Sequence, residues 1–95
     1  HFEKGTVTKI YKKGTRVIIG LEYFYCGEKF YYEFDTSTID YEKALEKLPN
    51  KQLFVIFKEN EPEEPFILFS EGNFERFNLL IPDSTKKLYE SVQDQ

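Results

Sequence analysis

Apolar and polar side chains alternate along residues 16–25, which is the clearest strand pattern in the chain. Because successive side chains of a strand point to opposite faces, the pattern places one apolar face against a core. That face carries Val17, Ile19, Leu21, Tyr23 and Tyr25, and the opposite face carries Ile18, Gly20, Glu22 and Phe24.

Residues 29–35 repeat the alternation and predict a second strand that returns beside the first. If Cys26 and Gly27 form a two-residue turn, Tyr23 faces Phe30. If the turn is Gly27 and Glu28, Tyr25 faces Phe30 instead. Both registers keep the apolar residues on one face and put glycine where a primed turn favours it, so the hairpin is predicted and its register stays open.

Residues 5–13 predict a strand that precedes this hairpin. A regular alternation would place Val7 and Tyr11 on one face. Thr6, Thr8 and Ile10 would then lie on the other face. A turn with Gly14 would connect this strand to residues 16–25.

Two further strands are expected in the second half of the chain. Residues 52–58 form a continuous apolar run of strand length, which is typical of a central strand buried on both faces. An acidic, proline-containing loop follows at 59–65, and residues 66–69 predict a short fifth strand. Residues 70–73 read as a turn.

A short helix is predicted between the third and fourth strands. Its apolar face has the helical spacing of Tyr41, Ala44, Leu45 and Leu48. Asp40 is expected to cap its start and Pro49 to close its end. Two helical turns are not stable alone, so this helix must pack on the sheet.

The C-terminal region gives weaker signals. Residues 74–81 fit a helix through Phe74, Phe77 and Ile81, and fit a strand through Phe77, Leu79 and Ile81. After Pro82, Asp83 or Ser84 could cap a last helix. Its thin apolar stripe consists of Leu88 and Val92.

These elements predict a mainly β fold with minor α. Its architecture would be a five-stranded antiparallel meander, closed into a small barrel or curved sheet, with one short helix and a C-terminal helical tail. Aromatic residues make up 18% of the chain, which favours a sheet. At 95 residues we expect a β-barrel-like domain over 1–82 and a tail over 83–95 that belongs to, or packs on, the same domain.

Charge and cysteine content narrow the function classes. The net charge is −4, which argues against high affinity for nucleic acid, although residues 1–16 hold five basic residues against Glu3 alone. Cys26 is the only cysteine, so no internal disulfide can form. No apolar run approaches the ~20 residues that span a bilayer.

The residue inventory predicts no catalytic, metal or cofactor site. His1 is the only histidine and begins the chain, so Cys26 has no histidine partner in the body of the domain. One cysteine and one terminal histidine do not make a zinc site. The glycines occur singly, without a phosphate-binding loop.

A contact surface is the strongest functional candidate. Phe24 and Tyr31 are predicted on the hairpin face opposite the core, with Glu22 and Lys29 beside them. Exposed aromatics on small barrels can stack bases or bind peptides. The alternative is that residues 74–81 or the last helix cover this face.

The order of motifs resembles a group of bacterial proteins of uncharacterised function, in which a short β-rich domain lies beside membrane-spanning helices. Gly5-Thr6-Val7 matches its opening strand, 22–30 its hairpin, and 53–57 with Asn60-Glu61-Pro62 its late strand and loop. Lys58-Glu59 replaces that family's first Asp-Pro, and residues 70–95 are additional.

This resemblance implies an upstream membrane anchor and offers no catalytic residues to carry over. The chain begins at His1 and contains no methionine, so we also expect a tag, a processed leader or an N-terminal region upstream. The first hypothesis is therefore a non-enzymatic module of a membrane-anchored protein that acts through protein contacts. The second is a free cytosolic barrel that binds single-stranded nucleic acid or peptide through Tyr31 and Phe24.

Overall fold

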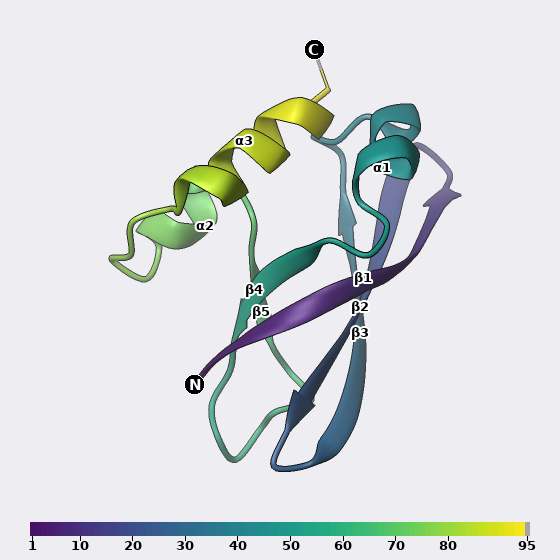
Figure 1. Cartoon of the computed structure of the whole chain (residues 1–95). Helices are drawn as coiled ribbons and strands as arrows, with labels where there is room; N and C mark the ends of the chain where they lie inside the picture. Colours follow the sequence, from purple (N-terminus) through teal and green to yellow (C-terminus); the bar gives the residue numbers. More distant parts are fainter. Residues whose placement is uncertain (95) are drawn as a thin grey trace.

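Five antiparallel strands form a curled half-barrel sheet in the computed structural model, which describes residues 1–94, and short helices close one end and one side (Figure 1). The mainly β class with a curved antiparallel sheet is confirmed. The elements are β1 (Phe2–Lys13), β2 (Arg16–Tyr25), β3 (Glu28–Thr36), α1 (Tyr41–Lys47), β4 (Gln52–Ile56), β5 (Phe66–Leu68), α2 (Glu71–Glu75) and α3 (Asp83–Val92).

The strands lie in the order β3-β2-β1-β4-β5, so the expected meander is wrong. The long strand β1 pairs with two strands: its residues 2–6 pair with β4 and its residues 6–13 pair with β2. The chain leaves β3, passes through α1, and returns on the far side of β1. β3 and β5 are therefore the two edges of the sheet, and no ladder among residues 1–94 joins them.

The hairpin of β2 and β3 adopts the first of the two registers. Tyr23 pairs with Phe30, and the turn consists of Cys26 (φ 52°) and Gly27 (φ 79°). A type I′ turn requires positive φ at both central residues, which suits glycine and costs free energy at a cysteine. The hairpin therefore has Cys26 and Gly27 at its tip.

A β-bulge in β1 corrects the predicted faces of that strand. Val7 pairs with Leu21 but Lys9 pairs with Gly20, so one extra residue lies between these pairs. Beyond the bulge the alternation is inverted. Ile10 consequently packs against the core with Val7, while Tyr11 lies on the opposite face. The prediction that Val7 and Tyr11 share a face is wrong for this reason.

The main core fills the concave, inner face of the sheet. The apolar alternation of β2 is confirmed, because its inner residues from Val17 to Tyr23 are at most 3% exposed. α1 adds Ala44 and Leu48, and the predicted Asp40 cap is confirmed by its hydrogen bond from the Lys43 amide. The predicted apolar face of α1 is wrong at one position, since Leu45 is 41% exposed.

A second, smaller cluster lies on the outer face, where α2 packs over β4 and β5. Phe54, Leu68 and Phe74 meet there, and the Phe54 and Phe74 rings lie 6.3 Å apart. β4 is thus covered on both sides, although it alternates between fully buried inner residues and half-buried outer ones.

Residues 70–73 were expected to form a turn, and this is wrong because they begin α2. The Ser70 side chain accepts from the Asn73 amide, and the Asn73 side chain accepts from the Ser70 amide, which is a capping box. In the ambiguous segment 74–81, Phe74 and Glu75 complete α2 and no strand follows.

α3 joins the tail to the main core. Pro82 precedes its first turn without a side-chain cap, so neither Asp83 nor Ser84 caps the helix. The apolar stripe is confirmed, because Val92 is fully buried and Leu88 packs against the core. The Asp40 amide donates to the Val92 carbonyl, which fixes the end of α3 beside α1. Residue 95 of the expected tail lies outside the described residues.

Within residues 1–94, no helix has the length and hydropathy needed to cross a membrane.

Candidate functional site

All four residues of the predicted contact surface come together on the outer face of the β2–β3 hairpin. Glu22 pairs with Tyr31, and Phe24 pairs with Lys29 on the neighbouring rung. Phe24 is 58% exposed and Tyr31 is 47% exposed. We call these four residues, Glu22, Phe24, Lys29 and Tyr31, the hairpin surface.

Tyr31 is held rigidly although half of it faces solvent. Its ring lies over Gly20, where a Cβ atom would overlap the phenol. Its hydroxyl donates to Glu33 Oε2 at 2.8 Å, and the Tyr11 hydroxyl donates to Glu33 Oε1 at 2.6 Å. Desolvation and the Glu33 hydrogen bond raise the pKa of Tyr31 from 10.0 to about 12. Glycine at position 20 therefore provides the slot that fixes this ring.

The outer face of the β2–β3 hairpin carries charges of both signs. Lys29 Nζ lies 3.7 Å from Glu22 Oε1, and Arg16 Nε lies 2.7 Å from Asp35 Oδ2. The two tyrosine hydrogen bonds lower the pKa of the Glu33 carboxyl, so it stays ionised. The face is therefore of mixed charge rather than strongly positive.

Among residues 1–94, no other element covers Phe24 and Tyr31, so the covering layer expected as the alternative from the sequence is not found there. Residues 74–81 pack elsewhere: Phe74 meets Phe54, and the Phe77 ring lies 5.5 Å from Phe66. α3 packs at the end of the barrel, beside α1 (Figure 1). The hairpin surface remains open to solvent.

A second candidate region is the seam between the edge strands β3 and β5. It holds two cavities of about 190 Å³ each, which share Phe34, Ile67 and Asn73 as a common wall. The aromatic cavity is lined further by Tyr32, Phe66 and Phe77. The hydroxyl cavity is lined further by Thr36, Thr38, Ser70 and Tyr89.

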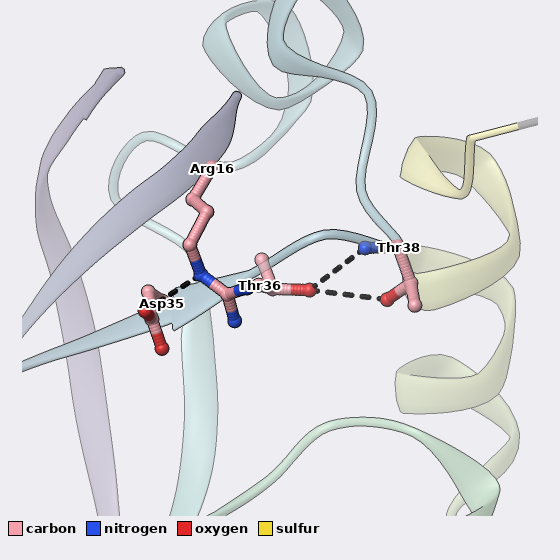
Figure 2. Close-up of polar contacts among 4 residues, drawn as sticks. All are labelled: Arg16, Asp35, Thr36 and Thr38. Carbon is pink, nitrogen blue, oxygen red and sulfur yellow. Dashed lines mark hydrogen bonds and ion pairs between the residues drawn. The ribbon is translucent and has the colours of Figure 1, made fainter. Parts of the chain in front are cut away.

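Polar contacts fix the C-terminal end of β3 beside the hydroxyl cavity. Figure 2 shows the Arg16 side chain reaching from β2 to Asp35 on β3. It also shows Thr36 Oγ1 accepting from the Thr38 amide at 3.1 Å. Thr38 Oγ1 lies 3.0 Å from the Tyr89 hydroxyl, which connects this end of β3 to α3.

An acidic loop borders the other end of the seam. We call residues 58–64, which include most of the loop expected at 59–65, the acidic loop, because they hold four glutamates and Lys58. The Tyr23 hydroxyl donates to the Pro62 carbonyl at 2.6 Å, which holds the loop against the hairpin. A hydrogen bond that protonated Glu64 donates to Glu61, together with the negative charge of Glu61, raises the pKa of Glu64, because the carboxylates are crowded.

The residues considered for catalysis and metal binding are not assembled into such a site. Cys26 is exposed at the hairpin tip, and the His1 imidazole contacts the Glu3 carboxylate at 2.9 Å. Among residues 1–94, no three His, Cys, Asp or Glu side chains are grouped as metal ligands.

Comparison with known proteins adds no assignment. No protein-family model matches the chain, and no curated protein or solved structure matches it significantly. The resemblance to bacterial membrane-anchored proteins therefore stays a prediction.

Sequence reasoning missed three residues that organise the hairpin surface, namely Tyr11, Gly20 and Glu33. Tyr11 was assigned to the wrong face because the bulge in β1 was not expected. The spacing of Val7 and Ile10 carried a signal, since two core residues three apart in a strand require one extra residue between them.

Proposed function

We propose that the protein is a non-enzymatic binding module whose hairpin surface contacts a partner protein. The observation that carries this proposal is the exposure of Phe24 and Tyr31, at 58% and 47%, on one face of a rigid hairpin. Aromatic residues are enriched in the cores of protein interfaces and contribute much of their binding energy.

The contacts that hold the Tyr31 ring in place favour binding of a partner. Because Gly20 and Glu33 already fix the ring, a partner orders few additional side-chain torsions when it covers this surface. A side chain that is preorganised in this way loses less conformational entropy on association.

The charges favour a protein over a phosphate-rich ligand. The Glu22–Lys29 ion pair lies beside the aromatic residues, and the Arg16–Asp35 ion pair lies toward the other end of the same hairpin. A polar rim around an apolar centre is the usual composition of a protein interface, whereas nucleic-acid affinity rests mainly on unneutralised basic residues.

Two serine variants test the proposal, one at an exposed aromatic residue of the hairpin surface and one at an exposed aliphatic residue elsewhere. Phe24→Ser should reduce co-purification of a specific protein from native cells by about tenfold or more, because it removes the proposed anchor. Leu80→Ser is the control, since Leu80 is 95% exposed on a different part of the surface. Equal recovery of the same partners with both variants would refute the proposed surface.

The membrane-anchored context is a further part of the proposal and rests on the resemblance alone. We expect the native protein in washed membranes at a mass well above 11.4 kDa. Recovery of a soluble species near that mass would remove the anchor from the proposal and leave the hairpin surface to be tested separately.

A second candidate function is binding of single-stranded nucleic acid on the same hairpin. The strand order and the helix between β3 and β4 resemble the connectivity of OB-type barrels, whose second and third strands often bind oligonucleotides. Lys9 and Lys13 also lie near Glu33 on this face. A fold analogy does not assign function by itself. Absence of oligonucleotide binding at low salt would exclude this candidate.

A further inference from the structure

The hairpin register determines which backbone groups of β3 are free. The two-residue turn at Cys26 and Gly27 makes Tyr25 and Glu28 a hydrogen-bonded pair, and such pairs recur at every second position. Even-numbered residues of β3 therefore bond to β2, while odd-numbered ones direct their backbone groups away from it. The outward set is Lys29, Tyr31, Glu33 and Asp35.

This outward edge has no strand partner within residues 1–94, because β3 is the last strand on its side of the sheet. Four residues present four amides and four carbonyls along this edge. An unpaired strand edge of this length is a template for another extended chain. Main-chain hydrogen bonds supply the affinity in such strand addition, and pockets for alternate side chains supply the specificity.

The two seam cavities are neighbours, as the sites for alternate side chains of an added strand would be. They adjoin each other across Phe34 and lie between β3 and β5, on the side toward which the inner side chains of β3 point. Residues i and i+2 of a strand lie about 7 Å apart on one face. An apolar side chain suits the aromatic cavity, and a small polar one suits the neighbouring hydroxyl cavity.

Charge selects the kind of chain that can approach. The acidic loop carries four glutamates against Lys58 and stands at the hairpin end of the seam. Lysine or arginine in the incoming segment would be attracted there. A second copy of this chain carries the same net charge of −4, so its approach is opposed by repulsion.

We propose that the free edge of β3 binds an extended, basic peptide segment of a partner protein as a sixth strand. Its alternate side chains enter the aromatic and hydroxyl cavities, and its basic residue meets the acidic loop. This proposal rests on the backbone edge of β3 and on the cavities, whereas the proposed hairpin surface rests on outer side chains, although Lys29 and Tyr31 belong to both.

The test uses the intact ¹⁵N-labelled protein and synthetic decapeptides that carry valine at position i and threonine at position i+2, so that both side chains lie on one face, with lysine at both ends. Peptide binding should slow hydrogen exchange at the amides of Lys29, Tyr31, Glu33 and Asp35. The amides of Phe30, Tyr32 and Phe34 are internal controls, because they already bond to β2. N-methylation of alternate peptide amides should weaken binding about tenfold or more, because it removes strand hydrogen bonds.

Charge is tested on both partners. Replacing the peptide lysines by glutamate should abolish binding, and the loop variant Glu61→Gln/Glu63→Gln/Glu64→Gln should reduce affinity for the lysine peptide several-fold. The matched control is Glu46→Gln/Glu75→Gln/Glu90→Gln, which removes three exposed carboxylates elsewhere and should preserve affinity.

Three results would overturn the proposal. One is no binding of the lysine peptide at millimolar concentration. Another is binding that N-methylation does not weaken or that leaves exchange at the four edge amides unchanged. The third is edge protection that rises with protein concentration without peptide, which would assign the edge to a second copy of the chain.

Discussion

The outer face of the sheet carries aromatic residues in two regions that differ in how they are covered. Over β4 and β5, α2 places Phe74 against Phe54, and Phe74 is only 2% exposed. Over β2 and β3, Phe24 and Tyr31 have no such helix and remain about half exposed. Both regions belong to the same sheet surface, so the covering segment decides the difference.

The comparison teaches that similar residue types serve different purposes on one face. The covered region stabilises the fold by burying apolar area. The open region leaves that area available to a partner, and its ring positions are fixed by local contacts with Gly20 and Glu33. Substitutions in the two regions should therefore differ most in their effect on the free energy of unfolding.

Phe74→Ala should produce the largest loss of stability. Removing a fully buried ring leaves a cavity beside Phe54 and Leu68, and such changes cost about 3–5 kcal/mol. Urea denaturation measures this loss. Phe24→Ala is the matched variant from the open region and should change stability by about 0.5 kcal/mol or less. Equal costs would show that the open region also stabilises the fold.

Gly20→Ala should destabilise the protein by about 1–3 kcal/mol, because the added methyl group displaces the Tyr31 ring. The same substitution in a Tyr31→Ala background should cost much less, since the obstacle is gone. A double-mutant cycle by urea denaturation measures the difference. Additive effects would contradict the account of how Tyr31 is held.

Gly27→Val tests the turn that supports the open region. It should cost about 1–2 kcal/mol, because valine strains at positive φ. Cys26→Asn should instead stabilise modestly, since asparagine tolerates this conformation better and favours type I′ turns. Thermal denaturation checks both changes, and unchanged stability of Gly27→Val would mean that the turn is misplaced.

Alkaline pH should weaken the fold through buried or hydrogen-bonded tyrosines. Burial raises the pKa of Tyr23 to about 12, and Tyr31 has a similar value, whereas the unfolded groups titrate near 10. The protonated forms are favoured in the folded state, so their contribution is complete below pH ~10 and is lost as pH rises toward ~12.

Thermal unfolding at pH values across this window measures that loss. Tyr31→Phe should show a shallower fall in Tm than the wild type, since phenylalanine has no hydroxyl to titrate. Identical pH profiles would mean that Tyr31 is not protected from ionisation by its contacts.

Local patterns predicted much of the fold, because strand alternation and turns depend on neighbouring residues. The β2–β3 hairpin, the Asp40 cap and the Val92 stripe were found in this way. The strand order was not predictable on this basis, since the pairing of β1 with β4 joins residues about 50 positions apart. The seam and its free edge follow from that order and were therefore missed.

The candidate surface was predictable where it depends on one hairpin. Glu22, Phe24, Lys29 and Tyr31 follow from alternation on two adjacent strands. The exposure of these four side chains was not predictable, because the position of residues 74–81 depends on long-range packing of Phe74 and Phe77. The contact of Tyr11 with Glu33 also depended on the unexpected bulge in β1.

The most direct test of the hairpin surface as a protein-binding face is photo-crosslinking in native cells with a reactive phenylalanine analogue at position 24. The exposed position of Glu90 on α3 provides the control site. The account predicts a discrete protein adduct from position 24 that is absent from position 90. Crosslinks to nucleic acid from position 24, or the same adducts at equal yield from both positions, would contradict it.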